Sequence, residues 1–199
     1  MSRWQPDSRS RLEQAALQLF RERGFEQVTV AEIAVRAGLT DRTFFRHFTD
    51  KREILFSGQQ ALSDVYVRTI AEQPESAAPV AVVATALHAV AETFFDEDRR
   101  EFVRHRQEVV DSNTGLRERD LLKRAFLSEA IAGALRGRGV SDFEAALTAE
   151  MGTATFKIAY ARWIAGPPHD TLAELIDETL ADLHAAFANP PVRAGAGSP

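Results

Sequence analysis

Side chains that can donate hydrogen bonds to an anion gather between residues 40 and 51. Hydroxyls, guanidiniums, an imidazole and an ammonium group share this stretch, namely Thr40, Arg42, Thr43, Arg46, His47 and Lys51. Such donors bind phosphate oxygens, and an arginine can also bind O6 and N7 of guanine with two hydrogen bonds. The chemistry indicated is recognition of a phosphate-rich polymer, with Arg42 as the first candidate for reading a base.

The residues around these donors predict two short helices joined by a tight turn. Thr29 and Glu32 have the spacing of a capping box, and the helix that they begin runs to Ala37. Gly38 ends that helix, and Thr40 follows as the N-cap of the next one. This is the outline of a helix-turn-helix, a motif whose second helix enters the major groove of DNA.

The second of these helices has an apolar and a polar face. Phe44 and Phe48 are four residues apart, so they share one side of the helix, which we expect to be buried. Lys51 lies in the first turn of a following helix that Asp50 caps. A cation there is unfavourable to the helix dipole, which indicates an external anion beside it. The residues left pointing outward are Arg42, Thr43, Arg46 and His47.

The composition is that of a soluble globular protein, because 45% of the 199 residues are hydrophobic and 27% are charged. Cysteine is absent, which excludes disulfides and thiolate metal sites. The net charge is −5, yet residues 1–55 hold ten Lys and Arg against eight Asp and Glu. No apolar run reaches the ~20 residues that span a bilayer, and the N-terminus lacks the apolar core of a signal peptide. We therefore expect a cytoplasmic protein without membrane contact.

Apolar spacing and capping residues predict an all-α fold of about nine helices, without strands or internal repeats. The helix over 141–165 is expected to be buried on two sides, because it carries two apolar faces. The first face is Phe143, Leu147, Met151, Ala154 and Ile158, and the second is Ala149, Gly152, Phe156, Tyr160 and Trp163. The Pro- and Gly-rich tail, residues 190–199, is expected to be disordered. The helices are expected at about 8–23, 30–37, 41–48, 51–73, 79–95, 98–112, 116–136, 141–165 and 171–187.

Residues 9–55 resemble the TetR family of bacterial transcriptional regulators. The resemblance rests on the segments FRERGFEQVTV, AEIAVRAGLTDRTFFRHF and DKREILF, which together form a long and ordered motif. It implies a helix-turn-helix DNA-binding domain over 8–55, with the motif itself at about 29–48. It also implies an effector-binding and dimerisation domain over 56–189. A homodimer would form through the helices at 141–165 and 171–187, using the second apolar face of the former and the apolar stripe of the latter.

The resemblance gives the donor residues roles. Arg42 and Thr43, in the recognition helix that Thr40 begins, match positions that reach base edges. The positions that match phosphate contacts are Thr29, His47 and Lys51.

Phe45 departs from the family pattern. The family more often has a tyrosine at this position, whose hydroxyl contacts a phosphate, and phenylalanine cannot donate that bond. We expect Phe45 to pack on sugars or on a thymine methyl, and Arg46 to replace the missing phosphate contact.

The C-terminal half offers polar and aromatic candidates for the effector cavity that the resemblance implies. Each has a plainer interpretation, since rings and histidines also fill cores, and Glu129 could equally be a solvated partner of Arg124 or Arg136. The histidines lack the third ligand of a metal site, so we expect neither a metal nor a cofactor. The candidates are His88, Phe95, Phe102, His105, Phe126, Glu129 and Trp163.

The expected function is a sequence-specific, ligand-responsive homodimeric repressor on double-stranded DNA. A small apolar or amphipathic effector would release it from a near-palindromic operator. The alternative is a ligand carrier or an enzyme on the same scaffold that does not bind DNA. The sequence offers no nucleophile–base pair, phosphate-binding glycine loop or metal set for an enzyme. The polar face over 41–48 argues against a pure carrier.

Overall fold

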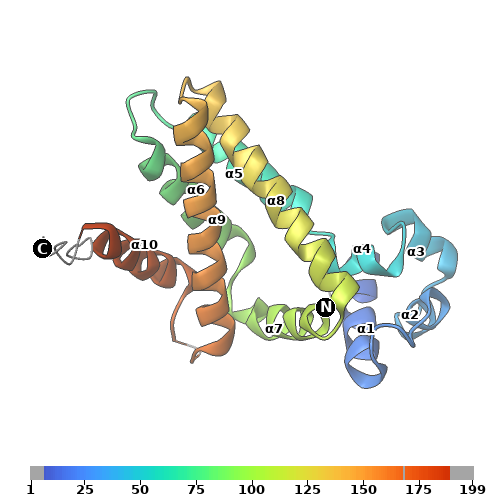
Figure 1. Ribbon diagram of the computed structural model, residues 1–199. Helices are drawn as coiled ribbons and strands as arrows, with labels where there is room; N and C mark the ends of the chain where they lie inside the picture. The colour runs from blue at the N-terminus through green and yellow to red at the C-terminus, as the bar shows by residue number, and fades with distance from the viewer. Residues whose placement is uncertain (1–6, 168, 189–199) are drawn as a thin grey trace, which may run out of the picture.

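The computed structural model describes residues 7–167 and 169–188, and every regular element in these ranges is a helix (Figure 1). The predicted all-α class is confirmed. The expected disorder of residues 190–199 lies outside the described residues. The helices are α1 (Ser8–Arg23), α2 (Val30–Arg36), α3 (Asp41–His47), α4 (Lys51–Phe56), α5 (Gln59–Glu72), α6 (Pro79–Phe94), α7 (Glu97–Asp111), α8 (Thr114–Gly137), α9 (Asp142–Ala165) and α10 (Leu172–Ala188).

The single helix expected over 51–73 is two helices, α4 and α5, separated at Ser57 and Gly58. Side chains from other helices occupy the backbone carbonyls that a continuous helix would use. Arg106 of α7 donates from Nε to the Leu55 carbonyl over 2.5 Å, and Arg9 of α1 donates to the Ser57 carbonyl over 3.0 Å. These bonds are long-range, so helix spacing could not reveal the break. A smaller correction concerns α7, which Asp96 caps and which begins at Glu97, one residue before the predicted start at 98.

The helices α1 to α4 form one end of the molecule, and α8 runs diagonally away from that end (Figure 1). Their apolar core contains Phe44 and Phe48, both almost fully buried, as the four-residue spacing predicts. This core also draws Val109 and Val110 from α7 and Leu116 from α8. The start of the C-terminal half therefore completes the core of the N-terminal helices.

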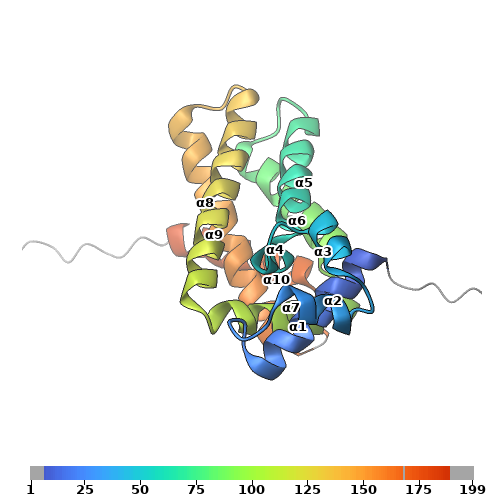
Figure 2. The same ribbon diagram turned by 90° about the vertical axis from the view of Figure 1, so that its right-hand side faces the viewer.

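A second apolar core lies among α5, α6, α8, α9 and α10, which lie above and behind α1 to α4 in the view of Figure 2. Gly152 of α9 lies against Val83 of α6, and a Cβ on this glycine would be 2.5 Å from Val83 Cγ1. The absence of a side chain at Gly152 therefore allows α6 and α9 to approach closely. Within the described ranges no single helix is long and apolar enough to cross a membrane; only α6 and α7 together, bent by 96°, have the length and composition.

The α9 face expected to form the dimer surface lies inside the protomer instead. Ala149, Gly152 and Trp163 of this face are buried in the protomer, and Gly152 lies against Val83 of α6. The apolar stripe of α10 is used in the same way, since Leu172 and Leu175 are buried in the second core. The other face of α9 is the exposed one, with Phe143 at 79%, Leu147 at 50% and Ile158 at 51% of full exposure.

Candidate nucleic-acid interface and ligand cavity

The turn between α2 and α3 is held by caps and by a glycine in the left-handed region. Thr40 accepts a hydrogen bond from the Thr43 backbone N–H and so begins α3. Gly38 has φ +66°, a conformation that side chains disfavour. Arg11 of α1 donates to the carbonyls of Ala37 and Gly38, so the turn is also fixed from the neighbouring helix.

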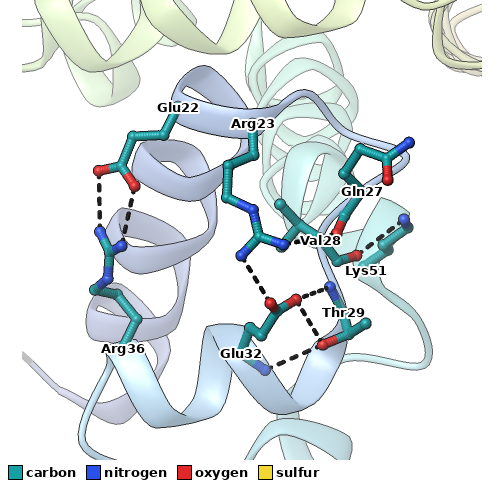
Figure 3. A network of polar contacts seen from close by, with 8 residues as sticks. All are labelled: Glu22, Arg23, Gln27, Val28, Thr29, Glu32, Arg36 and Lys51. Atoms are coloured by element: carbon teal, nitrogen blue, oxygen red, sulfur yellow. Dashed lines mark hydrogen bonds and ion pairs between the residues drawn. The ribbon is translucent and has the colours of Figure 1, made fainter.

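Thr29 and Glu32 form the predicted capping box at the start of α2 (Figure 3). The Glu32 carboxylate accepts from the Thr29 backbone N–H over 2.9 Å and from Arg23 over 2.7 Å. The hydrogen bond from the Thr29 backbone, together with Arg23 and the Thr29 hydroxyl, lowers the pKa of Glu32 to about 2. On the other side of α2, Arg36 forms two hydrogen bonds with Glu22 of α1. Polar contacts on two sides therefore set the position of α2.

The outer face of α3 carries the donors that the sequence places there. Arg42 and Arg46 are exposed, and Phe45 is 58% exposed while Phe44 beside it is fully buried. Within residues 7–167 and 169–188, Arg42 has no hydrogen-bond or ion-pair partner. The carboxylate of Glu53, on the next helix α4, accepts a hydrogen bond from Arg119 of α8 over 2.9 Å. The guanidinium of Arg42 is thus available to a ligand.

Two further α3 side chains contact their neighbours. The Thr43 hydroxyl lies 3.1 Å from that of Thr40. The Nε2 atom of His47 lies 3.0 Å from the hydroxyl of Ser8, the first residue of α1. The predicted set Thr40, Arg42, Thr43, Phe45, Arg46 and His47 lies on α3 or at its cap, while Thr29 lies at the start of α2.

The sequence indicates an external anion beside Lys51. In the structure, backbone carbonyls of the chain itself accept hydrogen bonds from Lys51 instead. Its ammonium group donates to the carbonyls of Phe25, Glu26 and Val28 at 2.8, 3.2 and 3.1 Å. The same ammonium lies 4.4 Å from the centre of the Phe25 ring. An ammonium has three protons, and this loop accepts all of them. Lys51 therefore holds the connection between α1 and α2, a contact across 23 to 26 residues that helix-dipole reasoning misses.

A cavity of about 920 Å³ lies among α5, α7, α8 and α9 and extends to α1 and α4. Three of the predicted effector residues line it, namely Phe95, Phe102 and Phe126. Its volume lies in the range of sites for small organic ligands.

The other four predicted effector residues lie elsewhere. Trp163 is a core residue, 1% exposed. His88 of α6 lies 2.8 Å from an Asp177 oxygen of α10, and His105 lies 3.0 Å from Arg21 of α1. Glu129 is exposed and pairs with Arg136, which is the plainer of its two interpretations. These polar groups are satisfied at helix–helix contacts or at the surface.

Charged residues in the cavity wall were not predicted from the sequence. On each helix considered alone, these residues belong to a polar face, and helical periodicity assigns such a face to the solvent. They come together only because α7, α8 and α9 converge, so no local spacing marks them. The missed residues are Arg99, Arg106, Asp120, Lys123, Arg124 and Lys157.

Two family models together match most of the chain. A model for bacterial regulatory proteins of the tetR family matches residues 13–57, and one for the MftR C-terminal domain matches residues 77–188. A helix-turn-helix at one end of an all-helical chain, joined to a cavity-containing half, defines a class of bacterial regulators. The chain belongs to the TetR family of transcriptional regulators.

Individual relatives are more distant. The HTH-type transcriptional regulator TcmR of Streptomyces glaucescens is 32% identical over 83 residues, a match that spans 42% of this chain and 37% of TcmR. The Thermus thermophilus repressor FadR, solved with lauroyl-CoA, is 25% identical with a TM-score of 0.55; the alignment covers 95% of this chain and 100% of FadR. SmeT, solved with triclosan, is 20% identical with a TM-score of 0.61. The alignment covers 98% of this chain and 100% of the SmeT chain.

Proposed function

We propose that this chain acts in the cytoplasm as a ligand-responsive, homodimeric repressor. The observation that carries the proposal is the exposed donor face of α3, held by caps on both flanking turns, with Arg42 available to a ligand. Two such helices in a dimer would enter successive major grooves about 34–36 Å apart on a near-palindromic operator. The residues proposed to contact DNA are Thr29, Thr40, Arg42, Thr43, Phe45, Arg46 and His47.

The test is a gel-shift titration with DNA from upstream of the chain's own gene against a scrambled copy. We expect specific binding that weakens steeply with salt, because phosphate contacts release counterions. Arg42→Ala should cost about 1–3 kcal/mol and relax preference at one base pair. Arg68→Ala removes an exposed arginine of α5 and is the matched control. Equal ratios of operator to scrambled binding in Arg42→Ala and wild type would remove Arg42 from base reading.

The dimer is proposed to use the exposed apolar face of α9. Phe143, Leu147 and Ile158 expose large side chains along one side of this helix, and exposed apolar faces of this kind mark contacts with other chains. We expect a dimer by light scattering at micromolar concentration and a monomer for Leu147→Asp. A wild-type monomer under these conditions would contradict the proposal.

The effector is proposed to bind in the cavity and to lower DNA affinity. The aromatic lining, including Phe95 and Phe156, favours an apolar or amphipathic molecule. FadR with lauroyl-CoA and SmeT with triclosan support this ligand class by analogy. The alternative, a carrier without DNA binding, predicts ligand binding but no salt-dependent gel shift.

A further inference from the structure

The charged residues of the cavity wall are predominantly positive. Arginines and lysines at six positions face three carboxylates, those of Glu13, Glu53 and Asp120. Glu13 pairs with Arg9 over 3.3 Å. The six cations are Arg9, Arg99, Arg106, Lys123, Arg124 and Lys157.

The remaining carboxylates of the wall are also engaged. Asp120 is 7% exposed, and it pairs with Arg124 at 2.8 Å and with Arg106 at 3.6 Å. Glu53 is taken by Arg119 of α8. In the described part of the chain Arg99, Lys123 and Lys157 have no carboxylate partner, so positive charge in the wall is left uncompensated.

An aromatic cluster lies beside this positive wall. The rings of Phe95 and Phe156 are 5.5 Å apart, and each lies within 6 Å of the Tyr160 ring. Burial raises the pKa of Tyr160, and the positive charge of Arg106 opposes that rise. Tyr160 therefore adjoins both the apolar and the cationic parts of the cavity.

The cations of the wall also hold the end of α4. Phe56, the last residue of α4, is 1% exposed, and its ring lies 5.3 Å from the Arg106 guanidinium and 5.9 Å from the Lys123 ammonium. Arg106 additionally donates to the Leu55 carbonyl. A group that draws Arg106 or Lys123 into the cavity therefore acts directly on the helix that follows the recognition helix.

We propose that the cavity binds an amphipathic anion, with an oxyanion head group at Lys123, Arg106 and Lys157. The apolar body of the ligand packs on Phe95, Phe156 and Tyr160. An oxyanion gains charge-assisted hydrogen bonds from these donors, while a cationic or neutral head leaves the positive wall uncompensated. The inference deepens the proposed function, because it assigns a chemical class to the effector and places its head group beside α4.

The test compares two fluorescent probes that differ in charge. 1-Anilinonaphthalene-8-sulfonate carries a sulfonate, and N-phenyl-1-naphthylamine has the same ring system without it. In titrations of the full-length dimer at low salt, we expect the sulfonate to bind at least tenfold more tightly. Equal affinity for the two probes, or tighter binding of the neutral probe, overturns the proposal.

Variants then locate the head group. Lys123→Gln and Lys157→Gln should each reduce the preference for the sulfonate at least threefold, while Arg68→Gln, an equal charge change on the outer side of α5, should leave it unchanged. A preference that survives both lysine variants places the anion elsewhere and overturns the assignment. Lys157 is exposed, so Lys157→Gln should fold normally. If circular dichroism shows that Lys123→Gln does not fold, the Lys157 variant alone tests the head-group position.

DNA binding is measured separately in a gel shift without probe. If the chain shifts operator DNA but shows no preference for the sulfonate probe, the anion site is wrong and the proposed regulatory function stands. If the chain prefers the sulfonate probe but does not shift DNA, the proposed regulatory function is wrong and the anion site stands.

Discussion

The recognition helix and the cavity wall use cationic side chains in opposite ways. On α3, Arg42 and Arg46 extend from an exposed face. At the junction of α4, α7 and α8, Arg106 and Arg119 lie over the Phe56 ring and bond, respectively, the Leu55 carbonyl and Glu53. Available cations suit recognition of an external partner, whereas engaged cations fix helices relative to one another. The second set can transmit a change because a ligand can compete for it.

The largest effect is expected within α3 itself, where two adjacent phenylalanines lie on its buried and its exposed face. Phe44→Ala should destabilise the protein by about 3–5 kcal/mol, because it removes a fully buried ring. Phe45→Ala removes a ring that is 58% exposed, so the melting temperature should change little while operator affinity falls. Thermal melts and gel shifts on both variants separate the two faces. Similar melting temperatures for the two variants would mean that α3 does not have the inward and outward faces described above.

The contrast between the two faces of α3 could be read from the sequence because its signals are local. The caps at Thr29 and Thr40, the glycine at Gly38 and the four-residue spacing of Phe44 and Phe48 all lie within 20 residues of one another. Each signal fixes a backbone direction or a helix face without reference to the rest of the chain. The helices α1, α2 and α3 therefore agree closely with their predicted ranges.

The cavity could not be predicted in the same way. Phe126 and Glu129 are three residues apart on α8, yet one lines the cavity and the other pairs with Arg136 at the surface. That distinction depends on where α7 and α9 pass, which helical periodicity does not encode. The break between α4 and α5 has the same origin, because Arg9 and Arg106 come from distant parts of the sequence.

A second prediction tests whether Arg106 carries the signal between cavity and DNA. In wild type, saturating 1-anilinonaphthalene-8-sulfonate should weaken operator binding by about 5–150-fold, the usual range of 1–3 kcal/mol for coupled sites. Arg106→Gln keeps a polar side chain but loses the charge over Phe56, so the probe should change operator affinity less than threefold. Arg104→Gln, an exposed neighbour on α7, is the control and should retain the full effect. Undiminished coupling in Arg106→Gln would place the transmission elsewhere.

Lys51 lies in the DNA-binding region, but all three of its ammonium protons are donated to carbonyls of the chain itself. A variant of Lys51 therefore tests whether a cation in this region binds DNA or holds the fold. Lys51→Met keeps the apolar stem and removes hydrogen bonds to three carbonyls, so we expect a loss of about 1–2 kcal/mol in unfolding free energy. Because the ammonium group serves the loop, the salt dependence of DNA binding should stay unchanged. A slope reduced by about one unit would show that Lys51 neutralises a phosphate.

The smallest expected effect is a pH dependence at Glu32, whose ion pair with Arg23 is local to the DNA-binding region (Figure 3). Its pKa falls from 4.5 to about 2 on folding, so its charge stabilises the fold fully above about pH 4.5. That contribution is lost as pH falls through about 2, where the carboxylate is protonated in both states. Glu32→Gln keeps the capping geometry without the charge, so its melting temperature should lie below wild type at pH 6. The difference should shrink steadily towards pH 2.

A matched variant separates this effect from a general response to acid. Glu75, in the segment between α5 and α6, is exposed and has no ion-pair partner within the described ranges. Glu75→Gln should therefore follow the wild-type melting curve at every pH. A difference between Glu32→Gln and wild type that stays constant from pH 6 to pH 2 would mean that the amide perturbs the capping box itself. The negative charge of Glu32, which both the Thr29 backbone and Arg23 stabilise, would then contribute nothing to holding α2.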